Sequence, residues 1–441
     1  MQKIDLTNIQ TVHFVGIGGI GISAIARMML LEGKRVSGSD SSESKILEEL
    51  RRAGATIHIG HSASYVPEGC DLVVYTIAVP PENPERAEAA KRDLVALSYP
   101  EILGLISVEK YTIAIAGTHG KTTTTAMIAK ALMDAQKDPT VIVGSLLLNV
   151  NPSNPSGRHT NFIAGRSEYF VVEACEYRRS FLNLSPKLLV ITNIDNDHLD
   201  YYKDIADIVS AFNEIVRKVP KDGFIICNPE APHMHGALLG VTAKIVDYTA
   251  YGSATRKLLV PGKHNQMNAS AASAASAALG LAPADTEKSL SQFSGTWRRF
   301  EYKGETKVGA MVYDDYGHHP TEIKATLSGA RELFPNKKII AVFQPHLFSR
   351  TKLLFADFAN AFGDADVVLL APIYAARETV DISVTSEALA HAIAQTGKEA
   401  YALPSFGALV NQLSSIISKD TVVLTIGAGD IYQVGEQLLT Q

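Results

Sequence analysis

Cysteine is scarce in this chain, which has only Cys70, Cys175 and Cys227 among its 441 residues. Their number is odd and no two of them have C-x-x-C spacing, so the sequence excludes a disulfide framework and a cysteine-based zinc site. Sparse cysteine is typical of proteins in a reducing compartment. We therefore predict a cytoplasmic protein.

Long hydrophobic runs are also absent. No apolar stretch reaches the ~18 residues that a membrane-spanning helix needs, and the first residues lack the apolar core of a signal peptide. The longest weakly polar stretch, residues 269–284, is rich in Ala and Ser and predicts one packed helix. We expect no membrane insertion.

Charge of one sign is not in excess. With 41 Lys and Arg against 46 Asp and Glu, the formal net charge of −5 gives no basic field that would attract nucleic acid. Gly (32) and Pro (19) are too few for a collagen-like or low-complexity chain. The 46% of hydrophobic residues is typical of a globular protein, and the length predicts about three domains of ~150 residues each.

Short apolar runs alternate with helical segments along the chain and predict three α/β units in series. We place these units at residues 1–108, 109–295 and 296–441. The polar, Pro-rich stretch 149–159 predicts a surface loop within the second unit. The predicted strands are residues 11–15, 35–40, 71–76, 111–116, 169–172, 188–191, 224–227, 311–313, 338–343, 367–370 and 422–425.

A first glycine loop follows the strand at residues 11–15 and opens a helix. It fits G-x-G-x-x-G at Gly16, Gly18 and Gly21, with Asp40 at the end of the next strand. In this context the glycines permit a tight turn and close approach to a diphosphate at the helix N-terminus, and the acid suits a ribose. Alone, the loop predicts NAD binding, and the alternative is a turn needed only for packing.

A second glycine loop, Gly117–Thr124, lies between a buried strand and a helix. The backbone N–H groups of such a loop cradle phosphates, Lys121 can reach the β- and γ-phosphates, and the Thr122 hydroxyl can ligate Mg²⁺. The loop departs from the strict G-x-x-x-x-G-K pattern, because Ile115 stands at the position of the first glycine.

Acidic residues follow the next two predicted strands. Glu173 ends the strand at 169–172, and Asp195, Asp197 and His198 come soon after the strand at 188–191. Open α/β sheets bind ligands at the carboxyl ends of their strands. Both groups are therefore expected near the phosphates, where a P-loop site needs a carboxylate beside the metal.

A series of further motifs runs through nearly the whole chain. It comprises GIGGIG at 16–21, GTHGKTT at 117–123, EACEY at 173–177, TNIDNDH at 192–198, PGKHN at 261–265 with Asn268, RRF at 298–300, DDYGHHPTE at 314–322, and FQPH at 343–346 with SRT at 349–351. In residues and in order, this series resembles the ATP-dependent Mur ligase family.

The resemblance implies a fold and a reaction. The fold is three α/β domains in series: an N-terminal Rossmann-like domain, a central P-loop ATPase-type parallel sheet and a C-terminal Rossmann-like domain. The reaction is ATP-dependent amide formation through an acyl phosphate, joining L-alanine to UDP-N-acetylmuramate in peptidoglycan precursor synthesis. ATP and Mg²⁺ are the implied cofactors, with Mn²⁺ as the alternative metal. The oligomeric state stays open between monomer and dimer.

The resemblance also implies roles for individual residues, and it reassigns the first glycine loop from NAD to the UDP-sugar. Residues implied in UDP-sugar binding are Gly16, Gly18, Gly19, Gly21, Asp40, His61 and Thr76. Those implied in ATP binding are Gly117, Thr118, His119, Gly120, Lys121, Thr122, Thr123, His264, Asn265, Asn268, Arg299 and Asp315. The implied metal ligands are Thr122, Glu173 and His198, and the implied amino-acid contacts are Tyr316, His318 and Arg350. The implied catalytic set is Lys121, Glu173, His198, His318 and Arg350.

Three departures from the family pattern stand out. The acidic motif reads EACEY where many members have EADES. Leu347 replaces an arginine often found after Gln344-Pro345-His346, which places carboxylate recognition on Arg350. No lysine stands near Phe212-Asn213, so we do not predict the carbamylated lysine of several relatives.

Three alternatives remain open. A related ligase attaches a recycled peptide to the same nucleotide sugar and would share these motifs. A nucleotide-binding regulator without ligase chemistry is disfavoured by the complete set Lys121, Thr122, Glu173 and His198. A dehydrogenase would leave the second glycine loop and the C-terminal motifs unexplained.

Overall fold

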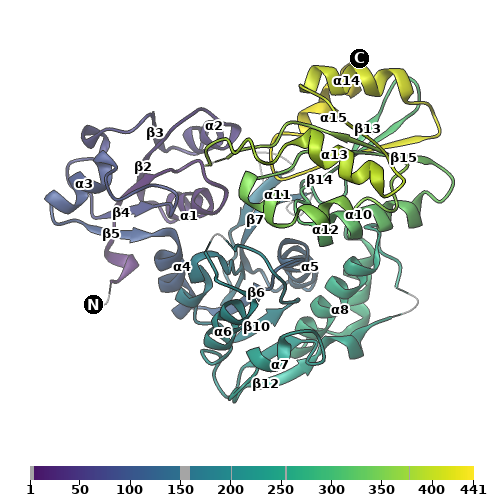
Figure 1. The fold of residues 1–441 in the computed structure, drawn as a ribbon. Helices are drawn as coiled ribbons and strands as arrows, with labels where there is room; N and C mark the ends of the chain where they lie inside the picture. Colours follow the sequence, from purple (N-terminus) through teal and green to yellow (C-terminus); the bar gives the residue numbers. More distant parts are fainter. Residues whose placement is uncertain (1–3, 149–158, 200, 254–255, 377) are drawn as a thin grey trace. The chain divides into compact units, whose positions relative to one another are not determined.

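The computed structural model describes residues 4–148, 159–199, 201–253, 256–376 and 378–441 (Figure 1). Residues 149–158 of the predicted Pro-rich loop lie outside this range. The chain forms two compact units. The first comprises Met1–Ser253 and Ala269–Leu290, and the second comprises Ala254–Asn268 and Ser291–Gln441.

The first unit begins with a five-stranded parallel sheet of order β3-β2-β1-β4-β5. All five residues of its central strand are buried, as expected when helices cover both faces of a parallel sheet. Its elements are η1 (Leu6–Asn8), β1 (Thr11–Val15), α1 (Ile20–Leu31), β2 (Arg35–Asp40), α2 (Lys45–Arg52), β3 (Thr56–Ile59), η2 (Ala63–Tyr65), β4 (Leu72–Tyr75), α3 (Pro84–Lys91), β5 (Val95–Ser98) and α4 (Tyr99–Val108).

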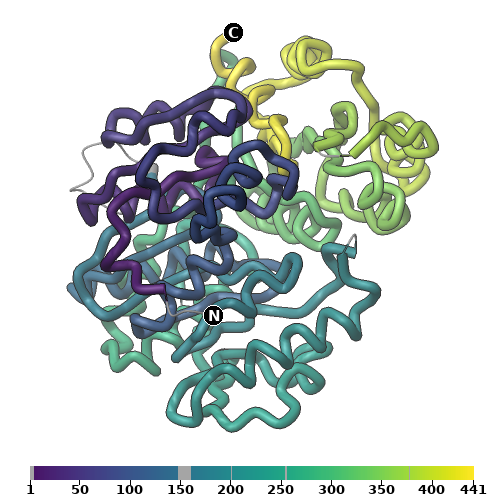
Figure 2. Tube along the Cα trace, turned by 90° about the vertical axis from the view of Figure 1, so that its left-hand side faces the viewer, coloured from purple at the N-terminus to yellow at the C-terminus, as the bar shows by residue number. Residues whose placement is uncertain are grey.

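The first unit also contains a seven-stranded sheet of order β12-β11-β10-β6-β9-β7-β8, parallel except for the β7–β8 pair. Its elements are β6 (Tyr111–Ala116), α5 (Lys121–Asp134), β7 (Thr140–Leu148), β8 (His159–Ile163), β9 (Tyr169–Glu173), η3 (Tyr177–Asn183), β10 (Leu188–Ile191), α6 (Ile205–Val216), β11 (Phe224–Cys227), α7 (Met234–Ala237), β12 (Lys244–Asp247) and η4 (Tyr248–Tyr251). Helix α4 leads the chain from the first sheet into this one, and Figure 2 traces the backbone from a second side.

The Ala/Ser-rich stretch predicted as a single helix belongs to two helices, so that prediction was wrong. Helix α8 (Lys263–Ala278) ends within the stretch and α9 (Pro283–Ser291) begins in it. Gly280 lies between them with a φ of +76°, a left-handed conformation that ends a helix at little cost for glycine.

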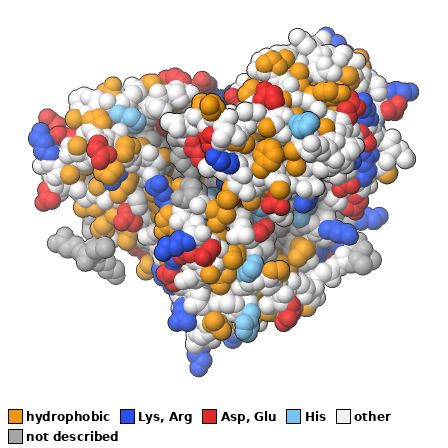
Figure 3. Space-filling model, in the orientation of Figure 1, with side chains coloured by type: hydrophobic (Ala, Val, Ile, Leu, Met, Phe, Trp, Pro, Cys, Tyr) orange, Lys and Arg blue, Asp and Glu red, His pale blue; other side chains and the backbone are white. Residues whose placement is uncertain are grey.

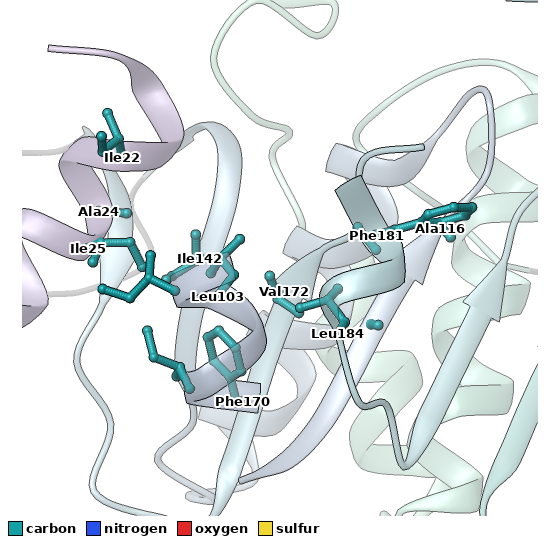
Figure 4. Close-up of a cluster of buried hydrophobic side chains, with 14 of the residues drawn as sticks. Ile22, Ala24, Ile25, Leu103, Ala116, Ile142, Phe170, Val172, Phe181 and Leu184 are labelled. Carbon is teal, nitrogen blue, oxygen red and sulfur yellow. The ribbon is translucent and has the colours of Figure 1, made fainter. Parts of the chain in front are cut away.

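One hydrophobic cluster joins the two sheets of the first unit (Figure 4). Ile22 and Ile25 of α1 and Leu103 of α4 are fully or nearly fully buried in it, together with Ile142 of β7 and Phe170 of β9. Shared burial of this kind stabilises both parts at once, because separating them would expose apolar surface to water. The first glycine loop and the second are therefore held within one packed unit.

The second unit is built on a six-stranded sheet of order β13-β14-β18-β15-β16-β17, in which only the β13–β14 pair is antiparallel. Its central strands β15 and β18 are buried almost throughout. The elements after α9 are β13 (Glu301–Glu305), β14 (Met311–Asp315), α10 (Pro320–Leu333), β15 (Lys338–Phe343), α11 (Phe348–Leu353), α12 (Phe355–Ala359), β16 (Val367–Leu370), α13 (Ser386–Gln395), β17 (Glu399–Ala402), α14 (Phe406–Ile416), β18 (Thr421–Ile426) and α15 (Tyr432–Thr440).

Helix α4 begins with two hydrogen bonds from Ser98 to Glu101. The Ser98 hydroxyl and the Ser98 backbone N–H both donate to the Glu101 carboxylate, at 2.6 and 2.7 Å. Because Ser98→Ala removes the hydroxyl that donates to the Glu101 carboxylate, it is expected to lower the free energy of unfolding by about 1 kcal/mol, the contribution of one hydrogen bond. Urea unfolding measures this, and Ser98→Thr, which keeps the hydroxyl, should unfold like the wild type. Equal stability of all three proteins would contradict it.

Candidate active site

The second glycine loop connects β6 to α5 and requires glycine at both of its ends. Gly117 has a φ of +127°, and a Cβ there would lie 2.1 Å from the Thr192 hydroxyl oxygen. Gly120 has a φ of +84° and directly precedes the first residue of α5. The start of α5 therefore presents backbone N–H groups and the positive end of the helix dipole, which favour a phosphate.

The segment after β10 holds this loop in place. His119 donates its backbone N–H to Asn193 Oδ1 (2.9 Å), and its carbonyl accepts from the Thr192 hydroxyl (2.6 Å). The Asp195 N–H donates to the Thr118 hydroxyl (2.9 Å), and Asp195 Oδ2 lies 3.2 Å from His119 Nε2. The side chains of Thr118 and His119 thus fix the loop, and Thr123 is buried at the start of α5.

Lys121 is the first residue of α5, and its ammonium group turns back over the loop. Nζ donates to the carbonyl oxygens of Gly117 (2.6 Å) and Thr118 (3.0 Å) and forms an ion pair with Glu176 (2.9 Å). Burial acts to lower the pKa of Lys121, but the negative charges of Glu176 and Glu173 and the hydrogen bond to Glu176 together raise it, and the net shift is upward. Lys121 is therefore a fully charged cation at the phosphate loop.

Thr122 and Glu173 form a pair of oxygen donors beside Lys121. The Thr122 hydroxyl lies 3.1 and 3.0 Å from the two carboxylate oxygens of Glu173, and Oε2 also accepts from the Gly144 N–H (2.9 Å). A hydroxyl and a carboxylate are the hard oxygen ligands that Mg²⁺ and Mn²⁺ prefer. The two residues fit a divalent cation at a phosphate site.

His198 lies beside Glu176. It has a φ of +54°, and its Nε2 is 3.7 Å from Glu176 Oε1 and 3.8 Å from Asp197 Oδ2. Its ring also packs against the ring of Tyr177, with centroids 4.8 Å apart. The structure therefore brings His198 and Lys121 together through one shared carboxylate.

A largely apolar cavity of about 280 Å³ lies within the first unit, next to the last glycine of the first glycine loop. Its lining includes Gly21 and Tyr99 together with Gly144, Glu173 and Cys175. Cys175 is exposed by its accessible surface, but desolvation by the surrounding protein atoms, followed by the negative charge of Glu176, raises the pKa of its thiol to about 12. Where EADES proteins have a carboxylate, this chain thus carries a neutral group at neutral pH.

The first glycine loop lies at the carboxyl end of the first sheet. Gly16 has a φ of +78°, and a Cβ there would lie 2.5 Å from Thr76 Cγ2. The Gly18 N–H donates to Asp40 Oδ2 (2.8 Å), and Gly19 precedes the first residue of α1. His61 follows β3 at the same edge. The residues predicted for the UDP-sugar therefore converge on one edge of the first sheet. One carboxylate oxygen of Asp40 already accepts a hydrogen bond from the loop.

The second unit collects the other residues predicted for ATP. Asn265 donates to the Pro261 carbonyl (2.7 Å), and Asn268 donates to Asn265 Oδ1 (3.3 Å). Burial lowers the pKa of His264. The nearby charges of Asp315 and Glu322 act to raise this pKa, and that of Arg299 acts to lower it. His264, Arg299 and Asp315 are therefore neighbours, and His264 is a neutral ring at neutral pH.

Both carboxylate oxygens of Asp315 accept hydrogen bonds from neighbouring groups of the second unit. Oδ1 accepts from the Gly317 N–H (2.8 Å) and the Thr326 hydroxyl (3.1 Å), while Oδ2 accepts from the Phe300 N–H (2.8 Å). The adjacent Asp314 forms a buried pair with Arg298 (2.6 Å). These bonds fix the strand end from which the predicted amino-acid contacts project.

The predicted amino-acid contacts Tyr316, His318 and Arg350 lie near one another, with the ring of His346 between His318 and Arg350. The Tyr316 and His318 rings meet edge to face at 5.7 Å, and the His318 and His346 ring centroids lie 6.0 Å apart. Arg350 Nη1 lies 3.4 Å from His346 Nδ1. Leu347 is 3% exposed and has a φ of +71°. The residue that replaces the family's arginine is thus packed into the domain.

Sequence reasoning assigned no role to two residues of these clusters, Glu176 and His346. Both stand inside motifs that the sequence displays, EACEY and FQPH, so the signal was present. What the sequence does not give is the contact of Glu176 with Lys121 or that of His346 with Arg350, since each joins different elements.

Two surface observations bear on partners. Of the helices that the structure describes, none combines the length and the hydrophobicity needed to cross a membrane. On the face seen in Figure 3, basic and acidic side chains are intermingled rather than gathered into fields of one sign.

Comparison with known families finds three matches in chain order. Residues 11–111 match the Mur ligase family catalytic domain, residues 115–256 the Mur ligase middle domain, and residues 298–429 the Mur ligase glutamate ligase domain.

Individual proteins are similar over the whole chain. UDP-N-acetylmuramate–L-alanine ligases from Clostridium acetobutylicum and Lachnospira eligens are 41% and 42% identical, and each alignment covers 100% of both chains. Among solved structures, the UDP-N-acetylmuramate-alanine ligase MurC of Thermotoga maritima is 31% identical with a TM-score of 0.80, covering 98% of this chain and 99% of that one. A murein peptide ligase of Psychrobacter arcticus is 25% identical with a TM-score of 0.70, covering 98% of each.

Proposed function

The chain belongs to the Mur ligase family, and we propose that it is an ATP-dependent ligase that joins L-alanine to the lactoyl carboxylate of UDP-N-acetylmuramate. The observation that carries this proposal is the phosphate loop with Lys121 above it and the Thr122–Glu173 pair beside it. It stands in a chain 41% identical, over its full length, to a ligase of that name. The product would be a peptidoglycan precursor.

ATP and a divalent cation are the cofactors that this site fits. Thr122 and Glu173 would hold the cation, with His198 as a further ligand, and the cation would neutralise charge on the β- and γ-phosphates. The loop residues Gly117–Thr123 would bind the phosphates. In the second unit, His264, Asn265 and Asn268 would contact the adenine, Arg299 the phosphates and Asp315 the ribose.

The reaction follows from the chemistry of the two substrates. A carboxylate has no good leaving group, so its oxygen first attacks the γ-phosphorus of ATP, the bond to the β-phosphate oxygen breaks, and an acyl phosphate and ADP form. The neutral amine of L-alanine then attacks the acyl carbon and expels inorganic phosphate, leaving the amide. Lys121 stabilises the phosphoryl oxygens as charge shifts during the first step.

The substrates would lie in the two remaining clusters. The loop Gly16–Gly21 with Asp40, His61 and Thr76 would hold the UDP-sugar. Tyr316, His318 and Arg350 would receive the amino acid, with Arg350 gripping the α-carboxylate and His318 orienting it. The supporting geometry is the convergence of each set in one region of its own unit.

We also infer three domains, at residues 1–108, 109–295 and 296–441. Each contains one of the three sheets, and the family matches at 11–111, 115–256 and 298–429 differ from these bounds mainly before residue 295. The cytoplasmic location expected from cysteine usage stays a prediction, in agreement with the three unpaired thiols.

Attachment of a recycled peptide to the same nucleotide sugar is the second candidate, because the murein peptide ligase of Psychrobacter arcticus is similar over 98% of both chains. The lower identity, 25% against 31% for the Thermotoga maritima structure, favours the alanine-adding reaction.

Phosphate release from ATP distinguishes these functions. With UDP-N-acetylmuramate present, we expect release that depends on L-alanine and not on D-glutamate or L-Ala-γ-D-Glu peptides. Release that depends on the peptide would identify the recycling ligase. Absence of release with every amine would overturn ligase chemistry and favour a nucleotide-binding regulator.

A further inference from the structure

A buried polar cluster lies on one face of the first sheet, next to the first glycine loop, whose Gly16 N–H donates to the Ser39 carbonyl (2.9 Å). His13 Nε2 lies 2.7 Å from Glu85 Oε2, and both side chains are 0% exposed. The second carboxylate oxygen, Oε1, lies 2.9 Å from His61 Nδ1. A fully buried carboxylate is costly unless it is paired and hydrogen-bonded, so its position demands an explanation.

The sheet register and a helix start bring the cluster together. His13 of β1 pairs with Ser37 of β2, and two residues further along Val15 pairs with Ser39. Residues two apart on a strand face the same way, so both serines lie on the His13 face. Glu85 is in the first turn of α3, where the Asn83 side chain caps the helix by accepting from the Glu85 N–H (2.9 Å).

The ionisation state of Glu85 determines which groups donate and which accept in the hydrogen bonds of the cluster. Burial acts to raise its pKa, but the hydrogen bonds from His13, Ser39 and His61 outweigh burial and lower it. Glu85 is therefore a carboxylate at neutral pH, and a carboxylate only accepts hydrogen bonds. His13 Nε2 and His61 Nδ1 must both carry a proton, and the Ser39 hydroxyl donates to the same carboxylate (2.7 Å).

This arrangement leaves the other nitrogen of His61 available. Nδ1 is occupied by Glu85 and Ser39, whereas Nε2 has no hydrogen-bond partner among the residues that the structure describes. The side chain is 26% exposed, in contrast to its buried partners. In the neutral ring with Nδ1 protonated, Nε2 carries a lone pair and accepts a hydrogen bond.

We propose that Glu85 is a positioning residue that holds the His61 ring by Nδ1 so that Nε2 accepts a hydrogen bond from a hydroxyl of the bound sugar nucleotide. His61 directly follows the last residues of β3, at the carboxyl edge of the sheet that also carries Asp40 and the Gly16–Gly21 loop. The assignment rests on the proposed function for the identity of the ligand. The tautomer of His61 does not depend on it.

The first test determines the tautomer of His61 by NMR, and it uses a variant only to assign the His61 signals. Long-range ¹⁵N–¹H NMR spectra of histidine-labelled protein report which ring nitrogen carries the proton, and the His61 signals are those missing from the His61→Phe spectrum. In the neutral His61 ring of the wild type, we expect Nδ1 to carry the proton and Nε2 to carry none. An Nε2-protonated neutral ring would overturn the proposal.

The second test measures binding of UDP-N-acetylmuramate by calorimetry without ATP or amine. His61→Phe and Glu85→Gln are each expected to weaken binding about fivefold, the effect of one hydrogen bond. His58→Phe is the matched control, since the His58 ring only stacks on Tyr65, with centroids 4.2 Å apart, and it should bind like the wild type.

The outcomes separate this proposal from the proposed function. Unchanged binding by Glu85→Gln with lowered stability would show that the cluster is structural only and would overturn the positioning role. Wild-type binding without amide formation would overturn the ligase reaction but leave this assignment standing. Failure of the wild type to bind the sugar nucleotide would overturn both.

Discussion

Replacing Lys121 by methionine is expected to lower kcat for ATP-dependent phosphate release by about 10³-fold or more, the usual cost of removing a cation from a phosphoryl-transfer site. Methionine keeps the length and apolar stem but removes the charge that lies 2.9 Å from Glu176. The thermal midpoint should fall as well, because Glu176, with a side chain only 3% exposed, loses its counter-ion.

The control variants separate catalysis from folding. Lys130, on the same helix, pairs with Asp134 (2.8 Å), and its side chain is 19% exposed. That side chain forms no hydrogen bond with a candidate site residue among the residues that the structure describes, so Lys130→Met should keep full activity. The double variant Lys121→Met/Glu176→Gln removes both members of the buried pair and should recover stability without recovering activity. A double variant as active as the wild type would contradict the role of Lys121.

The chemistry of Lys121 was predictable from sequence, but its neighbour was not. Glycine, lysine and threonine between a buried strand and a helix define the phosphate loop locally. Glu176 belongs to a segment that only the fold brings to the loop, and its ion pair joins residues 55 positions apart. Local patterns therefore located the site, while long-range contacts determine its electrostatics. The same holds for Glu85 and His61, which are 24 positions apart.

The strands show where sequence patterns suffice. Central strands such as β1, β6 and β15 are apolar runs buried on both faces, and their predicted bounds are correct. Strands β3, β5, β12, β13 and β17 were missed, and each lies at the edge of its sheet with mostly exposed or half-buried residues. The edge strand β8 was missed as well, although residues 160–163 are buried. An edge strand has only one neighbouring strand, and β3, β12 and β17 carry charged or polar residues that break the apolar run of a buried strand. Strand β5 has the sequence Val-Ala-Leu-Ser, and its apolar run is short.

Strand β7 was missed for a different reason. Gly144 and Ser145 interrupt its apolar residues, and its pairing with β8 shifts register between Ile142 and Leu147. The interruption serves the site, because the Gly144 N–H donates to Glu173 and a Cβ there would lie 3.0 Å from the same carboxylate. A departure from a regular strand pattern here marks a position where backbone approaches a candidate metal ligand.

Replacing Arg350 by alanine is expected to raise the KM for L-alanine about 30- to 100-fold, since loss of one member of a charged hydrogen-bonded pair costs roughly 2–3 kcal/mol or more. The KM for ATP should stay unchanged. Arg350→Lys keeps the charge but loses the planar fork that matches a carboxylate, so its KM for L-alanine should rise only about tenfold.

Lys352 gives the matched control for Arg350, because it lies on the same short helix, is 59% exposed and pairs with Asp381 at 3.2 Å. Lys352→Ala should leave both KM values unchanged. Leu347 is buried at the position where relatives often have an arginine. No cation at that position can therefore replace the charge that Arg350→Ala removes. An Arg350→Ala enzyme with an unchanged KM for L-alanine would therefore require the amino-acid carboxylate to bind elsewhere in the second unit.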